Sequence, residues 1–157
     1  MILVKIFFIT SFLLLPSIGQ GQFFEKGHII TDVRNNVDWI RCSVGQNWNI
    51  EDEDCEGSAV KLNHEEIAVA IQQASEQLGG EWRLPSLEEL LSVVCDECDP
   101  PKINAEYFPK ISKEAYWTGT KNFFNSKMFW SVNFFTGHKY SRFFSYQRLP
   151  VLLVQDR

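Results

Sequence analysis

Residues 82–91 read Trp82-Arg83-Leu84-Pro85-Ser86-Leu87-Glu88-Glu89-Leu90-Leu91, and this stretch marks the start of a helix. Ser86 is a favourable N-cap residue, and Glu89 stands three positions later, as a capping box requires. The apolar residues that follow at helical spacing share one face: Leu87, Leu90, Leu91 and Val94. We therefore predict a helix that runs from Ser86 to near Cys95, and Pro100-Pro101 prevents its continuation.

A second helix is predicted upstream by the same kind of signal. Asn63 can cap it, and Glu66 stands three positions later. Apolar residues then recur with a period of about 3.6 and are expected to face a core: Ile67, Ala70, Ile71, Ala74 and Leu78. Gly79-Gly80 ends this helix.

Strand patterns lie on both sides of the two helices. The expected strands are a hairpin within residues 23–42 and single strands within 116–120, 129–135, 139–146 and 150–154. Thr136-Gly137 supplies the turn between the segments 129–135 and 139–146. Residues 43–57 are expected to form a loop. Two helices between N- and C-terminal strands predict an α+β fold with small antiparallel sheets and long loops.

The N-terminus has the layout of a secretory signal peptide. Lys5 is followed by the apolar run Ile6–Leu15, and Ser17-Ile18-Gly19 offers small residues for cleavage after Gly19. A membrane-spanning helix needs about 20 apolar residues, and this run is about half as long, so we do not expect a stable membrane span. The alternative is an uncleaved membrane anchor. We predict a signal peptide over residues 1–19, one domain over 20–157, and a secreted or periplasmic location.

All four cysteines lie in the exported part of the chain. In an oxidising compartment they are expected to form disulfides, and sequence proximity favours Cys42–Cys55 and Cys95–Cys98 among three connectivities. A Cys-x-x-Cys pair can also be a redox centre or half a zinc site. Acidic neighbours and the position at a helix end disfavour the redox alternative, and no nearby histidine supports zinc.

Charge is distributed unevenly along the chain. Residues 20–99 carry 5 Lys+Arg and 17 Asp+Glu, whereas residues 100–157 carry 9 and 3. The basic half is also rich in aromatic residues, which suits an anionic or sugar ligand through charge and ring stacking. The candidate binding residues are Lys121, Lys127, His138, Lys139, Tyr140, Arg142 and Arg148. Ordinary solvated cations on a sheet surface are the alternative interpretation.

No catalytic motif accompanies these features. The three histidines, His28, His64 and His138, stand apart in sequence, and we expect the last two to be exposed. The acidic run 51–54 matches no calcium-binding loop, so we expect a solvated loop and no metal or cofactor. Trp39, Trp82, Trp117 and Trp130 are expected in the core, and Arg83 is expected to bond a carbonyl or carboxylate.

Ordered blocks of residues resemble one known family. They are Ile30-Thr31-Asp32, Val37–Ser43, Gly45–Trp48 with Cys55–Gly57, Trp82–Ser86 with Glu88–Leu90, Phe108-Pro109, Tyr116–Thr118, and Trp130–Phe134 with Gly137. Over residues 27 to 155 the chain resembles the Lcl C-terminal domain family, a group of exported bacterial domains usually without an assigned function. That resemblance implies a C-type-lectin-like fold in which the two ends of the chain pair.

The resemblance also implies adhesion or recognition, including binding of sulfated glycosaminoglycans in some members. The chain departs from the family pattern at its last strand, which usually carries an arginine and often a cysteine. Here residues 151–155 read Val-Leu-Leu-Val-Gln, and the collagen-like repeat of the namesake protein is absent. Formylglycine-generating enzymes share the broad fold, but the C-terminal third of this chain has no cysteine to support that chemistry.

Two functions follow as hypotheses. The first is an exported, non-catalytic recognition or adhesion domain that binds a sulfated or acidic glycan or a surface protein through its basic, aromatic half. The second is a structural or assembly component of the bacterial envelope that binds another protein. Nucleic acid suits the charge but not an exported protein, so it is not expected as a partner.

Overall fold

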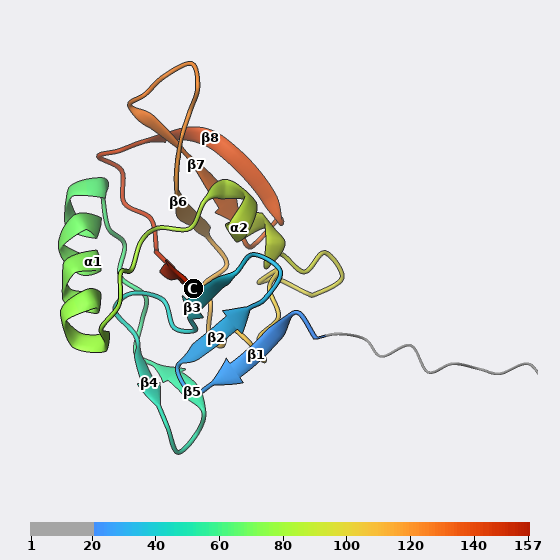
Figure 1. Ribbon diagram of the computed structural model, residues 1–157. Coiled ribbons are helices and arrows are strands. Elements are labelled where there is room, and N and C mark those ends of the chain that lie inside the picture. Colours follow the sequence, from blue (N-terminus) through green and yellow to red (C-terminus); the bar gives the residue numbers. More distant parts are fainter. Residues whose placement is uncertain (1–20) are drawn as a thin grey trace, which may run out of the picture.

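A computed structural model describes residues 21–157 (Figure 1). The signal peptide predicted for residues 1–19 lies outside the described residues. The described chain is α+β, with two helices and small antiparallel sheets, as predicted. Its elements are β1 (Phe23–Lys26), β2 (Ile29–Asp32), β3 (Val37–Ile40), β4 (Asn47–Asn49), β5 (Asp54–Glu56), α1 (His64–Leu78), α2 (Leu87–Ser92), β6 (Ala115–Lys121), β7 (Met128–Asn133), β8 (His138–Phe144) and β9 (Val154–Asp156).

The first sheet joins the two ends of the described chain in the order β1-β2-β3-β9. The predicted N-terminal hairpin is present, and Ile30 pairs with Trp39 in its register. Trp39 then pairs with Val154 of β9, so the last strand adds antiparallel to the third. This sheet lies at one side of the molecule and the sheet β6-β7-β8 lies at another, with α2 between them (Figure 1).

The last strand begins later than the predicted segment 150–154. Val151, Leu152 and Leu153 lie outside any regular strand, although all three are buried. Their backbone carbonyls bond different partners: Val151 accepts from Val44 N and Leu153 accepts from Ile40 N. The run passes between two clusters of the core and alternates from one to the other, which explains why it is apolar on both faces.

Residues 43–57 were expected to form a loop, and this prediction was wrong in part. They contain the short hairpin β4–β5, in which Trp48 pairs with Cys55. The guanidinium of buried Arg41 lies 4.5 Å from the ring centroid of Trp48. A three-residue strand in an acidic segment has little hydrophobic alternation, so the period-2 signal that indicates a strand is missing here.

Both predicted disulfides are present. Cys42 bonds Cys55 and ties the β4–β5 hairpin to the end of β3, and Cys95 bonds Cys98 just after α2. The two cysteines of the first bridge are buried. The described residues contain no free cysteine.

Each helix has the predicted capping box. Asn63 Oδ1 accepts from Glu65 N and Glu66 N at 3.0 Å, and Ser86 Oγ accepts from Glu89 N at 3.1 Å. Leu78, expected in the core, is 46% exposed because α1 ends there and only its earlier turns face the sheet β6-β7-β8 and the C-terminal run.

The second helix is shorter than predicted, since it ends at Ser92 rather than near Cys95. Ser92 Oγ donates to Glu89 O at 2.6 Å, and Val94 forms an isolated β-bridge with Ile103. That bridge draws the chain away from the helix axis.

The first half of β6 and half of the residues of β7 are buried, whereas no residue of β8 is fully buried. Tyr116 and Val132 pair and belong to one core cluster, whereas Trp117 and Phe129 point to the other. Bulges interrupt the register of both strand pairs. No helix among residues 21–157 is long and apolar enough to cross a membrane.

Candidate functional site

The basic half of the sequence places three candidate residues with basic side chains on β8, an edge strand of the sheet β6-β7-β8: His138, Lys139 and Arg142. Lys121 ends β6, and Lys127 and Arg148 lie outside the strands. The turn after β7 is held by Asn133, whose Oδ1 accepts from Phe135 N at 2.8 Å. His138 and Lys139 follow this turn and are exposed, and Arg142 is exposed farther along the strand. Cations on an exposed edge also prevent unwanted pairing with other strands, so charge here has a structural use as well.

Two of these cations lie over aromatic rings. Lys139 Nζ is 5.5 Å from the ring centroid of Trp130, and the Arg142 guanidinium carbon is 4.8 Å from that of Tyr140. Both distances fall within the range of a cation–π interaction. The rings are partly buried, so they hold the charged groups at the surface without removing them from water.

Most of the candidate cations have no carboxylate partner. Among the ion pairs of residues 21–157, none includes Lys121, Lys127, Lys139 or Arg142. Arg148 differs from them, because its guanidinium pairs with Glu66 at the start of α1. The charge of Arg148 is therefore neutralised by Glu66, whereas the other four cations keep a charge that is unpaired within the described chain.

The candidate residues lie along and beside β8 rather than around a pocket, and successive ones such as Lys139 and Tyr140 alternate between the two faces of the sheet. Lys139 pairs with Val132, whereas Phe144, at the other end of β8, pairs with Met128 next to Lys127. Phe144 follows Lys139 by five positions along the strand, which corresponds to about 17 Å. An edge strand without a pocket suits an extended ligand better than a small molecule.

His64 was expected to be exposed, and this prediction was wrong. It begins α1, and its backbone N donates to Ser145 O at 3.0 Å, which places its ring against Trp117 and Phe129. Burial lowers the pKa of His64, and the positive charge of Lys121 lowers it further. His138, in contrast, is exposed as expected.

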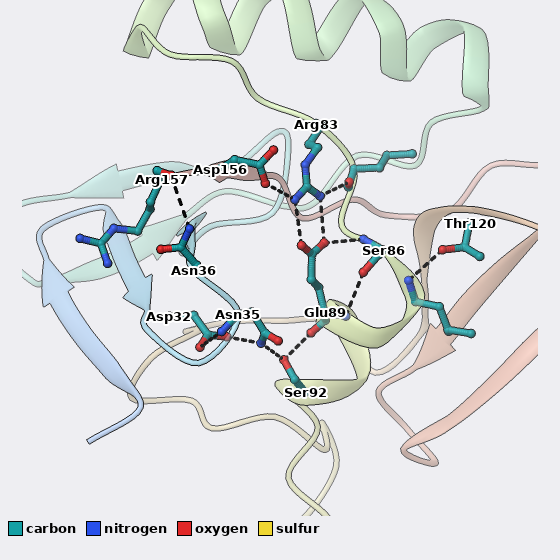
Figure 2. A network of polar contacts seen from close by, with 12 residues as sticks. Asp32, Asn35, Asn36, Arg83, Ser86, Glu89, Ser92, Thr120, Asp156 and Arg157 are labelled. Atoms are coloured by element: carbon teal, nitrogen blue, oxygen red, sulfur yellow. Dashed lines mark hydrogen bonds and ion pairs between the residues drawn. The ribbon is translucent and has the colours of Figure 1, made fainter. Parts of the chain in front are cut away.

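Arg83 has the structural role that its sequence position predicts. It donates to both carboxylate oxygens of Glu89 at 2.8 Å, to Asp156 Oδ1 at 2.6 Å and to Leu84 O at 3.1 Å (Figure 2). Burial raises the pKa of Glu89, but hydrogen bonds from Arg83 and from the Ser86 backbone outweigh it, so this pKa lies below its ordinary value.

A second polar cluster lies beside this one. Asp32 accepts from the side chain of Asn35 at 2.6 Å, and the same amide donates to Ser92 Oγ at 2.7 Å (Figure 2). Together with Arg83 these contacts fix α2 to β2 and β9, at the end of the first sheet where Asp32, Val37 and Asp156 lie in register. The polar groups of this cluster hydrogen-bond one another, so we interpret them as a structural network rather than as a ligand-binding site.

The acidic run 51–54 lies at the tip of the β4–β5 hairpin and is largely exposed. Lys110 Nζ pairs with Asp54 at 2.6 Å, and this hydrogen bond lowers the pKa of Asp54. Among residues 21–157 no group of three or more His, Cys, Asp or Glu side chains is placed to hold a metal ion.

A shallow apolar hollow of about 430 Å³ borders α1 and is lined by Val44, Val60, Leu62, Val69 and Ala70 among others. A neighbouring hollow of about 240 Å³ lies beside Cys42, Gly45 and Ala74. Neither hollow contains a histidine, a lysine or an arginine. Neither is lined by any of the seven candidate binding residues.

Sequence reasoning missed two features of the basic half. Trp130 was assigned to the core alone, but it is partly buried and also supports Lys139. Phe123 and Phe124 belong to the aromatic-rich half of the sequence and were not singled out, but both are 93% exposed. The asparagines on either side of this pair, Asn122 and Asn125, are the available signal, because asparagine favours tight turns.

These features define a class: a small, disulfide-bonded α+β domain with paired chain ends and a basic, aromatic edge strand. The family model of the Lcl C-terminal domain matches residues 28–155. The chain belongs to that family, which confirms the resemblance seen in the sequence. No curated protein and no solved structure matches the chain.

Proposed function

We propose that this protein is an exported, non-catalytic recognition domain that binds sulfated or acidic glycans along β8. The proposal rests on two cation–π contacts, of Lys139 with the ring of Trp130 and of Arg142 with the ring of Tyr140. In each pair an aromatic ring lies next to a cation that has no carboxylate partner among the described residues. The protein surface thus offers anion-binding groups that no internal contact has neutralised.

The chemistry of acidic glycans matches this arrangement. Their sulfate and carboxylate groups bind ammonium and guanidinium through charge-assisted hydrogen bonds, and arginine can contact two oxygens at once. The apolar faces of sugar rings can lie against aromatic side chains. A repeating polymer also presents several charges, and Lys139 and Arg142 lie three positions apart on the exposed edge of β8.

The proposal includes a C-type-lectin-like fold. Pairing of β3 with β9, which joins the two ends of the described chain, supports it. Two helices beside small sheets also agree with that architecture.

Export is part of the same proposal. The two disulfides support an oxidising location, since such bonds are rare in the cytosol. Acidic glycans are also abundant outside the cytoplasm, where an exported domain would meet them.

Heparin chromatography at two salt concentrations tests the glycan proposal. We expect retention at low salt, loss of retention at high salt, and binding on the order of tenfold weaker for the variant Lys139→Glu/Arg142→Glu. Arg34→Glu is the matched control, because Arg34 is an exposed cation in the turn between β2 and β3. Heparin retention that changes neither with salt concentration nor with the double substitution would contradict the proposal.

The second candidate is an envelope component that binds another protein through the same surface. Exposed aromatic side chains such as Phe135, at 55%, are a feature of protein interfaces and give this alternative some support. A pull-down from an envelope extract distinguishes the two. Co-purification of a partner by a protein that heparin does not retain would favour the envelope component.

A further inference from the structure

The loop between β6 and β7 presents two phenylalanines to solvent. Phe123 and Phe124 are each 93% exposed, more than any other large hydrophobic residue of the described chain. Figure 1 shows this loop as the orange segment that projects at the top of the molecule. Exposed apolar side chains grouped in this way mark interaction sites, because solvent exposure of both rings is unfavourable.

The loop holds the two rings outward by specific hydrogen bonds. Asn122 Oδ1 accepts from Phe124 N at 2.8 Å, and Asn122 Nδ2 donates to Ser141 O of β8 at 3.0 Å. Asn125 Oδ1 accepts from Lys127 N at 3.1 Å. The rings meet edge to face with centroids 5.4 Å apart. Contacts with backbone groups therefore define the loop, and the phenylalanines are not needed to build it.

Cations and a tyrosine surround this pair. Lys121 and Lys127 stand at the two ends of the loop, and both are exposed and unpaired among the ion pairs of residues 21–157. Ser145 N donates to Lys127 O at 3.0 Å, which brings Tyr146, 72% exposed, to the same end of the sheet. We call Lys121, Phe123, Phe124, Lys127 and Tyr146 the aromatic tip.

Two carboxylates lie near the tip, both at the start of α1. Glu66 is paired with Arg148, so its charge is neutralised. Glu65 is exposed and lines a small hollow together with Tyr146. The two unpaired lysines therefore leave the tip with a positive charge despite Glu65.

We propose that the aromatic tip docks on the surface of a bilayer that contains anionic phospholipids. Phe123 and Phe124 insert among the acyl chains, Tyr146 lies at the level of the headgroups, and Lys121 and Lys127 contact lipid phosphates. Charge complementarity and the projecting shape of the loop favour this occupant. A lipid surface receives a projecting apolar tip without a preformed pocket.

Co-sedimentation of the mature chain with vesicles tests this proposal. We expect binding to vesicles of phosphatidylglycerol and phosphatidylcholine and much weaker binding to phosphatidylcholine alone. Phe123→Ser/Phe124→Ser should weaken binding by about tenfold for each ring. Lys121→Gln/Lys127→Gln should weaken it by about fivefold for each charge, and Glu65→Gln should strengthen it.

Phe135→Ser is the matched control, since this exposed phenylalanine lies in the turn at the opposite end of the sheet. It should leave vesicle binding unchanged, and the thermal unfolding of every variant should match that of the wild type. The proposal is overturned if the wild type binds no vesicle or if the double phenylalanine variant binds as well as the wild type. A concentration-dependent dimer that the same variant abolishes would assign the tip to a second copy and would also overturn it.

Discussion

The imidazole of His64 is stacked on the ring of Phe129, with 3.6 Å between the ring centroids and 30° between their planes. Trp117 meets the same imidazole edge to face at 4.7 Å. His64 Nε2 is buried and has no hydrogen-bond partner in the described protein. Burial disfavours the protonated imidazole because it removes the charge from water, and the positive charge of Lys121 opposes protonation as well. The pKa of His64 is therefore lowered.

We predict that the protein loses stability as the pH falls below about 6.5, the ordinary pKa of histidine. In that range the unfolded chain takes up a proton that folded His64 resists. The stabilisation is therefore fully present above 6.5 and is lost as the pH falls through the folded pKa. His64→Phe keeps an apolar ring at this position and should remove this part of the pH dependence in thermal unfolding between pH 5 and 7.

Two variants serve as controls for the histidine. His138→Asn, at an exposed position, should leave the pH dependence in place. Lys121→Gln should raise the pKa of His64, because a nearby positive charge is removed, and an NMR titration of the imidazole measures this directly. A wild-type stability that stays level from pH 7 to 5 would contradict the prediction.

Arg83→Ala should destabilise the fold by about 2 kcal/mol, because it leaves the carboxylate of Glu89 partly buried without its partner. Urea unfolding at neutral pH measures the change. Lys61→Ala is the matched control, since the Lys61–Glu114 pair has the same 2.8 Å separation but lies at the surface. Its cost should stay below about 0.5 kcal/mol. An equal loss of stability in the two variants would show that the Arg83–Glu89 pair contributes no more than a surface ion pair.

Loss of the Cys42–Cys55 bridge should cost about 3 kcal/mol, and loss of the Cys95–Cys98 bridge about 2 kcal/mol. The first closes a sequence separation of 13 and the second a separation of 3, so the first restricts the unfolded chain more. Paired Cys→Ala variants and urea unfolding under oxidising conditions test this order. The reverse order would mean that contacts near α2, and not loop closure, determine how much each disulfide contributes to the free energy of unfolding.

Gly45→Ala should be more destabilising than Gly27→Ala. Both glycines have positive φ, so both substitutions strain the backbone by about 1 kcal/mol. A Cβ at Gly45 would also lie 2.7 Å from Val60 Cγ1 and 2.9 Å from Val60 N, whereas a Cβ at Gly27 meets nothing within 4 Å. Thermal unfolding of the two variants isolates the clash, and equal melting temperatures would contradict it.

The parts of the fold with local signals could be predicted from the sequence. Both capping boxes depend on residues three positions apart, and the helix starts at Asn63 and Ser86 were correct. The 151–153 run could not be assigned in detail, because its carbonyls bond segments far away in the chain. The same reason applies to His64, whose burial depends on β7, more than sixty residues later.

Glycan binding and membrane docking should be separable by substitution. Phe123→Ser/Phe124→Ser removes no charge, so it should abolish most vesicle binding and leave heparin retention unchanged. Lys139→Glu changes a cation about 17 Å along the strand from the end of β8 near the tip. That separation exceeds the screening length of about 10 Å at 0.1 M salt, so vesicle binding should change little while heparin retention falls. If each variant lost both activities to the same extent, β8 and the aromatic tip would form a single surface, and the assignment of different ligands to them would be wrong.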